Sequence, residues 1–526
     1  MHGKLILASL FAIVSLSGCA TMSATPRSSL SVTAMQADTA YLSGDGLEGR
    51  ALGTAGYDLA AAYVGDRFRS AGLKGWNGSV IQSVPLVKRV ADQARTPFVE
   101  LGGLRLISQG STIHLEADSV VDGELVFVGH GLRDETLAID DFKGVDLQGR
   151  VAVVIQAIPP GVPEALGYVR EANIRSMGGR GIIYLRLTQR PAGSRKNPPD
   201  PAIPGVRIDG VARSAAIPVV TLDLPEAEAL LNGSPVSIDK LRRTLASGQR
   251  LKPVELGQRA TIQANLEERR FASPNIVAMI PGSDPSLRNR PVVVTAHLDH
   301  LGKSPEEGGK DRIFNGALDN AVGVSIMLDV ARSIAGERRQ PSRPIIFAAV
   351  TSEETMMLGS TYLVDALLKQ GVIPAANVNI DMPVLTYEFS DITPYGADQS
   401  SLGPIVAQAA SRFGAAISGQ NQTGDPLWRS DQLAFINRGI PSVYVEPGPG
   451  NGGQAAWETY RAERYHKVGD DMSQPIDWRA VERFAGIHKA LILAIANDKR
   501  APSWNPGNGL EQYINKRLAE RREMAR

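Results

Sequence analysis

The stretch from residue 291 to residue 299 reads PVVVTAHLD and decides the fold expected for the second half of the chain. Its apolar, β-branched run has the length and composition of a buried strand, and it ends in a histidine and an aspartate. Similar runs follow at 345–350 and 378–380, separated by helical patterns over about 320–334 and 360–370. Strands that alternate with helices predict an α/β fold with a mixed, mostly parallel sheet and helices on both faces.

Side chains of the types that bind metals follow these three runs. His297 and Asp299 are two residues apart, so on an extended chain they point to the same face. Glu353 and Glu354 follow the second run, and Asp381 follows the third. Because ligands collect at the carboxyl ends of parallel strands, we expect these groups to lie together at one edge of the sheet. A carboxylate in such an apolar setting is costly unless it is paired or bound to a metal.

Two further residues complete a candidate metal set. Asp319 lies at a predicted helix start, where it also fits the role of a helix cap, and His466 follows Tyr465. Paired zinc ions require nitrogen and oxygen donors and a carboxylate that bridges them. The sole cysteine is Cys19, so a thiolate site is excluded. The candidate ligands are His297, Asp319, Glu354, Asp381 and His466.

These motifs resemble, in order and spacing, the co-catalytic di-zinc aminopeptidases of metallopeptidase family 28. The resemblance rests on His297-x-Asp299, Gly316-Ala317-x-Asp319-Asn320-Ala321-x-Gly323, Ser352-Glu353-Glu354, Asn379-x-Asp381-Met382 and Tyr465-His466. It implies the zinc exopeptidase fold and two Zn²⁺ ions, with Asp319 as the bridging carboxylate. His297 and Asp381 would bind one ion, and Glu354 and His466 the other. Glu353 would be the general base, and Asp299 would orient His297.

One segment departs from the family pattern. Ser430-Asp431-Gln432 stands where the family commonly has Ser-Asp-His near the substrate pocket. This difference bears on substrate specificity rather than on metal binding. Outside the motifs, His300 is expected to solvate the rim of the site, and His488 is expected to be structural.

The resemblance implies a zinc-dependent exopeptidase, first of all an aminopeptidase that removes N-terminal residues from peptides. A carboxypeptidase or dipeptidase on the same metal site stays open, because an arginine such as Arg429 or Arg438 would hold a substrate carboxylate. A receptor-like binding protein on a peptidase fold without catalysis is a third interpretation. Such a protein would be expected to have lost ligands or the base, and none is missing.

The pattern of apolar residues changes between residues 96 and 265. Short apolar runs at 151–155, 182–185 and 219–222 are separated by turn-rich segments, which predicts a separate β-rich module. Gly129-His130-Gly131 and the segment 178–184 resemble a protease-associated (PA) domain. The peptidase domain is then expected in two parts, 37–95 and 266–497.

The N-terminus has the features of an export signal. Lys4 precedes an apolar run over 5–16, which is shorter than a transmembrane helix requires, and Cys19 closes it. This arrangement resembles a bacterial lipobox, with residues 1–18 as a signal peptide, a lipidated Cys19 and a polar tether over 19–36. We therefore expect an exported protein that a lipid anchors to the cell envelope, on the periplasmic side of the outer membrane in a Gram-negative cell.

Composition narrows the remaining possibilities. The chain has 526 residues, of which 43% are hydrophobic, enough for two folded units. Its 56 basic and 55 acidic side chains give no electrostatic reason to expect a nucleic-acid partner, so peptides and the membrane are the expected partners. Residues 498–526 end in an Arg- and Glu-rich segment, which is expected to be a charged, solvated tail.

Overall fold

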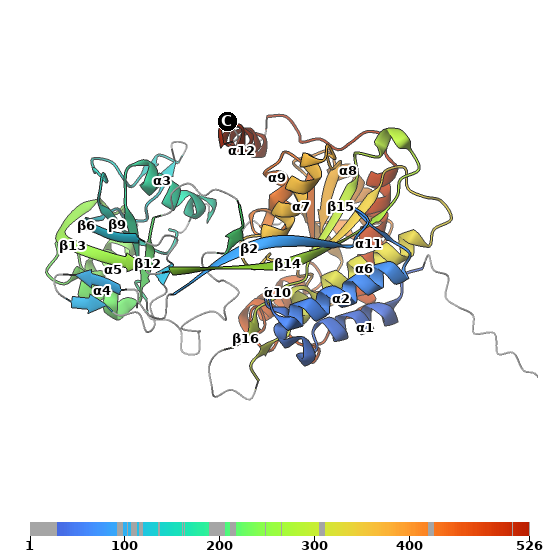
Figure 1. The fold of residues 1–526 in the computed structure, drawn as a ribbon, viewed down its shortest axis with the longest axis horizontal. Helices are drawn as coiled ribbons and strands as arrows, with labels where there is room; N and C mark the ends of the chain where they lie inside the picture. Colours follow the sequence, from blue (N-terminus) through green and yellow to red (C-terminus); the bar gives the residue numbers. More distant parts are fainter. Residues whose placement is uncertain are drawn as a thin grey trace, which may run out of the picture.

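The computed structural model describes residues 29–91, 98–101, 104–106, 113–114, 119–134, 137–159, 161–162, 164–188, 206–210, 217–247, 249–264, 266–304, 311–418, 426–507 and 509–524. The predicted signal peptide and Cys19 lie outside these residues. The described chain forms two lobes that a long ribbon of two strands joins (Figure 1). Among the described helices, none has both the length and the apolar character needed to cross a membrane.

The larger lobe contains a ten-stranded sheet in the order β11-β2-β14-β18-β15-β19-β22-β20-β21, with β1 paired to β14. The strands are β1 (Lys74–Gly75), β2 (Ile81–Ala91), β11 (Arg207–Ile208), β14 (Leu266–Ile280), β15 (Val292–His297), β18 (Ile345–Val350), β19 (Ala376–Asn379), β20 (Asp391–Tyr395), β21 (Ala416–Ile417) and β22 (Ser442–Pro447). The central strands β18, β15, β19 and β22 are parallel, whereas β14 and β20 are antiparallel to their inner neighbours.

The predicted mixed α/β sheet is confirmed, but the expectation of a mostly parallel sheet holds only for its centre. The chain leaves this lobe along β2 and returns along β14, and these two strands pair antiparallel over their length. A strand that leads out to an inserted module and a neighbour that leads back must run in opposite directions. Parallel pairing needs a crossover connection, which the helices between the central strands supply.

Alternation along the central strands places helices on both faces of the sheet. Val292 and Val294 share a core with α1 (Val32–Leu42), α2 (Ala55–Ser70), α6 (Val322–Ala335), α8 (Gly403–Ser411) and α11 (Trp478–Asn497). Val293 and Ile346 belong to a separate core with α7 (Leu358–Lys369) and α9 (Gln432–Ile436). Because successive side chains of a strand point to opposite faces, and both faces are covered, β15 is buried along its whole length and begins with three consecutive valines.

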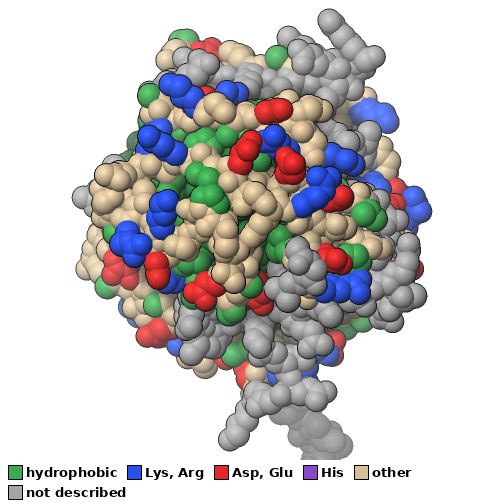
Figure 2. All heavy atoms as spheres, turned by 90° about the vertical axis from the view of Figure 1, so that its left-hand side faces the viewer, with side chains coloured by type: hydrophobic (Ala, Val, Ile, Leu, Met, Phe, Trp, Pro, Cys, Tyr) green, Lys and Arg blue, Asp and Glu red, His purple; other side chains and the backbone are tan. Residues whose placement is uncertain are grey.

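The smaller lobe contains an eight-stranded sheet in the order β4-β3-β13-β6-β9-β10-β12-β5. Its strands are β3 (Phe98–Leu101), β4 (Leu104–Leu106), β5 (Ile113–His114), β6 (Ser119–Phe127), β9 (Val151–Ile155), β10 (Gly181–Leu185), β12 (Val219–Leu222) and β13 (Val254–Ala264). Helix α3 (Arg170–Ser176) packs on one face, and α4 (Leu224–Leu231) and α5 (Ile238–Ala246) pack on the other. The end view of this lobe shows basic and acidic side chains interspersed (Figure 2).

The strands of this second sheet all lie within the segment predicted as a β-rich insert, 96–265. Three described strands of the same segment do not belong to it: β11 pairs with β2 of the larger sheet, and β7 (Arg133–Asp134) and β8 (Ile139–Asp140) pair only with each other. The small ribbon of β16 (Gly302–Lys303) with β17 (Ile313–Phe314) completes the described strands. The remaining helical elements are η1 (Asp45–Arg50), η2 (Glu164–Val169), η3 (Pro285–Leu287), η4 (Ala317–Ala321), η5 (Pro426–Trp428), α10 (Gly453–Glu463) and α12 (Gly509–Met524).

The predicted end of the tether at residue 36 falls inside the folded part of the chain. Helix α1 begins at Val32, so an extended segment cannot reach residue 36. The Ser31 hydroxyl accepts a hydrogen bond from the backbone N–H of Ala34, which caps the helix start, and Met35 is buried in the main core.

The C-terminal segment is also more tightly packed than a solvated tail. Leu510 and Ile514 on α12 are buried in a small core with Tyr444, and the Tyr513 ring packs edge-on against Trp428 with ring centroids 4.7 Å apart. An apolar face carried by an otherwise charged helix explains the difference, because the charged residues dominate the composition and hide the spacing of the apolar ones.

Helix α11 provides a pH-dependent test of the fold through His488. Its side chain is fully buried, its Nδ1 lies 3.0 Å from the Phe484 carbonyl oxygen, and its Nε2 has no hydrogen-bond partner in the described part of the chain. Burial lowers the pKa of His488 to about 4. In the unfolded chain the pKa is about 6.5, so the unfolded state binds the proton more readily between these values. The stability contribution is complete above about pH 6.5 and is lost as the pH falls toward 4.

The His488→Gln variant should therefore lose less stability on acidification than the wild type. Between pH 7 and pH 4.5, the unfolding free energy of the wild type should fall by roughly 2–3 kcal/mol more than that of the variant. Denaturant unfolding of both proteins at the two pH values measures the difference. Equal losses in the two proteins would show that His488 is not the titrating group.

Candidate metal centre

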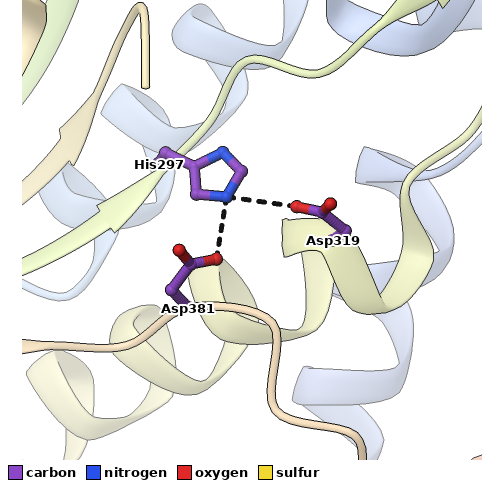
Figure 3. Close-up of side chains that lie close together, drawn as sticks. All are labelled: His297, Asp319 and Asp381. Carbon is purple, nitrogen blue, oxygen red and sulfur yellow. Dashed lines mark hydrogen bonds and ion pairs between the residues drawn. The ribbon is translucent and has the colours of Figure 1, made fainter. Parts of the chain in front are cut away.

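The carboxyl edge of the central strands brings the predicted side chains together. His297 is the last residue of β15, Glu353 and Glu354 follow β18, and Asp381 follows β19. Asp319 lies in η4, directly before α6. Figure 3 shows His297, Asp319 and Asp381 converging from three separate segments of the chain. Strand order, rather than proximity in the sequence, therefore assembles the cluster.

The first donor group is formed by His297, Asp319 and Asp381. The His297 Nε2 atom lies 2.9 Å from Asp381 Oδ1 and 3.2 Å from Asp319 Oδ1. Burial by itself would lower the pKa of His297, but the Asp381 and Asp319 carboxylates raise it well above its usual value. The three side chains lie close enough together to ligate one metal ion.

The second donor group shares Asp319 with the first. The His466 Nε2 atom lies 3.3 Å from Asp319 Oδ2 and 3.5 Å from Glu354 Oε2. One oxygen of Asp319 thus faces His297 and the other faces His466, the arrangement that a bridging carboxylate requires. Burial would raise the pKa of Asp319, but the surrounding imidazoles hold it well below its usual value.

His300 belongs to this second group, and its predicted place at the solvated rim is wrong. The side chain is fully buried, with Nδ1 2.8 Å from Glu354 Oε1 and 3.9 Å from Asp319 Oδ1. His300, Asp319 and Glu354 also form a set that can ligate a metal ion. Gly316 permits this packing: its φ is +58°, and a Cβ there would lie 2.5 Å from the His300 ring. The available sequence signal was a second histidine directly after Asp299.

Asp299 contacts His297 through its backbone and not through its side chain. The His297 Nδ1 atom lies 3.0 Å from the Asp299 carbonyl oxygen, which leaves Nε2 directed at the carboxylates. The Asp299 carboxylate instead accepts hydrogen bonds from the backbone N–H groups of Glu353, at 3.1 Å, and Glu354, at 3.3 Å. Burial raises the pKa of Asp299 to about 6. Its side chain therefore fixes the turn that carries the candidate base.

Asp470 fixes the backbone that carries Asp319. Its carboxylate accepts hydrogen bonds from the backbone N–H groups of Leu318, at 3.0 Å, and Asp319, at 3.1 Å, and from the Tyr460 hydroxyl, at 3.0 Å. Asp470 is far from Asp319 in the sequence, so only the folded chain shows that it holds the backbone of Asp319.

The other side of Asp319 is tied to the segment of Asp381. The Asn320 side-chain amide donates to the Ile380 carbonyl oxygen, at 2.9 Å, and its Oδ1 accepts from the backbone N–H of Met382, at 3.2 Å. The peptide bond between Asp319 and Asn320 is cis. These contacts hold the two segments of the first donor group in one register.

The segment that departs from the family pattern supports Asp381. The Ser430 hydroxyl donates to Asp381 Oδ2 at 2.5 Å, and the Gln432 Oε1 atom accepts from the Asn379 side-chain amide at 2.8 Å. The predicted effect of this segment was on substrate specificity, but these contacts reach a candidate metal ligand. Arg438, one of the two arginines considered as a carboxylate clamp, is paired with Asp365 at 2.6 Å.

The buried charge around these groups fits divalent cations. Asp299, Asp319 and Asp381 are almost fully buried, and within the described residues no lysine or arginine forms an ion pair with any of them. The buried Arg50 nearby donates to backbone carbonyl oxygens, at 2.9 Å to Leu298 and 2.6 Å to Asn315. Because carboxylates buried without a counter-charge are strongly disfavoured, this donor set is suited to metal ions that supply positive charge.

The cluster opens into a cavity of about 920 Å³ between the two lobes. Glu353 and Glu354 lie in its wall, Arg133 and Leu166 of the smaller lobe line one side, and Tyr513 of α12 also contributes. Burial raises the pKa of Glu353 well above its usual value, and the neighbouring Asp381 and Glu354 carboxylates add to the effect. A carboxyl group that takes up a proton readily thus lies beside the donor groups.

Sequence comparisons identify the region that carries the cluster. Residues 275–492 match the profile described as "Peptidase family M28". A curated relative from Pyrenophora teres f. teres (strain 0-1), "Probable zinc metalloprotease", is 25% identical over 313 residues, covering 52% of this chain and 63% of the relative. Another "Probable zinc metalloprotease", from Pyrenophora tritici-repentis (strain Pt-1C-BFP), is 33% identical over 197 residues, covering 37% of this chain and 42% of the relative. The chain thus spans less than two thirds of the length of these relatives.

Solved structures share the fold over most of the chain. The "Aminopeptidase from Aneurinibacillus sp. strain AM-1" is 19% identical, with a TM-score of 0.56 over 92% of this chain and 98% of that chain. BSAP, described as a zinc aminopeptidase from Bacillus subtilis, is 20% identical, with a TM-score of 0.51 over 90% of this chain and 97% of that chain. These structures show the fold alone, whereas the profile match makes residues 275–492 similar to peptidase family M28.

Proposed function

We propose that the protein is a zinc-dependent aminopeptidase that removes N-terminal residues from peptides. The observation that carries the proposal is the pair of nitrogen and oxygen donor groups that share Asp319 beside Glu353, in the wall of a large cavity. The relatives described as zinc metalloproteases and the aminopeptidases of similar fold support the same function.

In this proposal the site holds two Zn²⁺ ions. His297 and Asp381 would hold one ion, Glu354 and His466 would hold the other with His300 beside them, and Asp319 would be shared by the two groups. The donor chemistry supports zinc, because imidazole and carboxylate groups without thiolate form such centres. When bound, paired zinc ions supply Lewis acidity toward a carbonyl group and lower the pKa of water toward neutrality.

The protein's own residues handle the proton and position the substrate. Glu353 takes a proton from the attacking water and later donates it to the leaving amine, as a general base and then a general acid. The Asp299 carboxylate accepts a hydrogen bond from the backbone N–H of Glu353 at 3.1 Å, so it helps to hold the base at the cavity wall. The raised pKa of Glu353 favours both proton transfers.

The shape of the cavity supports an exopeptidase. The smaller lobe and α12 both line it, so the peptide meets walls on more than one side. An enclosed site of this kind admits the end of a chain more readily than its middle. We also propose that the smaller lobe is a PA-like domain whose contribution is to narrow this access.

A carboxypeptidase or dipeptidase on the same donor groups is the alternative enzyme. Arg429 lines the cavity, as an arginine that holds a substrate carboxylate would have to, whereas Arg438 is paired with Asp365. A receptor-like protein without catalysis is less well supported, because the complete donor set and the base are present.

Two measurements test the proposal together. Metal analysis of the purified protein should find about two zinc ions per chain. Peptides with a free N-terminus and an amidated C-terminus should be cleaved, whereas N-acetylated peptides should resist. Cleavage of the N-acetylated peptides, with resistance of the amidated ones, would instead identify a carboxypeptidase.

We propose, finally, that the protein is exported and lipid-anchored. The basic start, the apolar run and Cys19 support a lipoprotein signal, and the proposed location is the periplasmic side of the outer membrane in a Gram-negative cell. Mass spectrometry of the N-terminus of the cell-derived protein, with Cys19→Ser as control, tests this assignment.

A further inference from the structure

A recess beside the candidate metal centre contains a buried acid that the proposed mechanism does not use. Val384, Tyr387, Pro447 and Trp457 supply apolar walls, and Glu446 supplies a carboxylate. The recess itself has a volume of only about 10 Å³, too small for a side chain, but it shares Met382, Glu446 and Trp457 with the large cavity of about 920 Å³. A substrate would therefore reach Glu446 from the large cavity, at Met382, which directly follows the candidate ligand Asp381. The acid therefore stands next to the position that a substrate's terminal residue would occupy.

The Glu446 carboxylate has hydroxyl partners but no cation. Glu446 lies on β22 and is only 4% exposed. The Tyr444 hydroxyl donates to Oε1 at 2.8 Å, and the Tyr395 hydroxyl donates to Oε2 at 3.3 Å. Across the described chain, no lysine, arginine or histidine lies within ion-pair distance of it. Each oxygen keeps lone-pair capacity for a further donor.

A buried carboxylate without a cationic partner is energetically unfavourable unless a ligand supplies the positive charge. Burial raises the pKa of Glu446 to about 7, against the opposing effect of the two tyrosine hydroxyls. A carboxylate held in a largely apolar wall gains free energy when a cation arrives and donates a hydrogen bond to it. An apolar surface that ends in a carboxylate complements a side chain with an aliphatic stem and a cationic head.

Hydrogen bonds hold the outer wall of the recess in place. The Gly448 N–H donates to the Asp391 carbonyl oxygen at 2.7 Å, and the Tyr387 hydroxyl donates to the Gly448 carbonyl oxygen at 2.5 Å. A Cβ at Gly453 would lie 2.4 Å from the Tyr387 hydroxyl oxygen, so the wall is closely packed there. The carboxylate is therefore presented by a preformed surface.

Arg461 lines the large cavity, and its charge acts on Glu446 by lowering the pKa of that carboxyl group. Its guanidinium lies 5.5 Å from the Trp457 ring centroid and 5.0 Å from that of Tyr465, and its side chain is exposed. Its charge opposes the entry of a second cation, but solvent and salt screen an exposed charge far more than a buried one.

From these contacts we propose that Glu446 determines substrate specificity. It accepts a hydrogen bond from the cationic side chain of the substrate's N-terminal residue, so the protein prefers peptides that begin with lysine or arginine. The inference rests on the proposed aminopeptidase function and names the substrate class of that site.

The test compares lysyl and norleucyl 4-nitroanilide, which share an unbranched aliphatic side chain and differ in its charged end. The zinc-loaded wild type should show a kcat/KM about tenfold higher for the lysyl substrate, the size expected of one hydrogen bond to a charged group. The Glu446→Gln variant should lose about tenfold on the lysyl substrate and change little on the norleucyl one. The matched control is Glu458→Gln, which removes an exposed acid from α10 and should leave both values unchanged.

The outcomes separate this inference from the proposed function. If the wild type cleaves both substrates without preferring the lysyl one, the specificity assignment is overturned and the aminopeptidase stands. An equal loss on both substrates in Glu446→Gln would overturn it too, because the acid would then serve the α-amino group or the fold. If neither substrate is cleaved, the proposed function fails first. Calorimetric binding of L-lysine and L-norleucine to the wild type is a second measurement that needs no variant, and L-lysine should bind about tenfold more tightly.

Discussion

Replacing Glu353 with glutamine should lower kcat by about 10²-fold or more, while the protein keeps its metal ions. Glutamine preserves the size and the hydrogen-bonding shape of the side chain but cannot accept and return a proton at neutral pH. The backbone N–H of residue 353 would still reach the Asp299 carboxylate, so the turn after β18 should persist. The measurements are steady-state kinetics on an aminoacyl substrate and metal content, both on the same preparation.

The control for this experiment is Glu388→Gln. Glu388 is exposed in the same domain, so the substitution makes the same chemical change away from the cavity. Its kinetics should match those of the wild type. Near-normal turnover in Glu353→Gln would show that another group moves the proton, and a loss of metal in that variant would show that Glu353 is a ligand instead.

The Asp319→Ala variant should bind almost no metal, whereas His466→Ala should keep about one ion per chain. The reason is geometric, because Asp319 faces His297 with one oxygen and His466 with the other. Removing a shared ligand weakens both sites, whereas removing His466 weakens one. Hydrolysis by Asp319→Ala should fall to background, since both ions of the proposed centre are lost. Elemental analysis after dialysis measures the stoichiometry.

A readout that does not depend on catalysis keeps this prediction testable. A chelator should lower the thermal unfolding midpoint of the wild type, because bound metal stabilises the folded state. The midpoint of Asp319→Ala should not respond to the chelator. Asp398→Ala, at an exposed position, should respond like the wild type. Retention of two ions by Asp319→Ala would rule out the bridging role.

The sequence predicted the central strands because their signal is local. The runs that became β15 and β18 are continuous and β-branched, as strands covered on both faces must be. The flanks of the sheet were harder to predict. The pairing of β2 with β14 joins residues on either side of a whole inserted lobe, and no local pattern records that pairing.

In the site, too, features that depend on short motifs were predicted, whereas features that depend on contacts between distant segments were not. His297, Asp319, Glu354, Asp381 and His466 were named from their motifs, and the structure brings these side chains together. His300 was expected at the solvated rim of the site, and the contact of Asp470 with the backbone of Asp319 was not predicted. Their burial depends on the close approach of Gly316 in one case and on contacts with the backbone of Asp319 in the other.

The sequence by itself determined which donors the protein carries and on which kind of element each stands, because residue type and periodicity are properties of short segments. Only the tertiary structure decided which atoms meet. It places the backbone of Asp299, rather than its carboxylate, against His297. It also brings α12 and the smaller lobe to the cavity wall, and Glu446 to the same wall as Met382. The physical reason is that strand order and the packing of segments far apart in the chain set these contacts, and both are established only when the whole core forms.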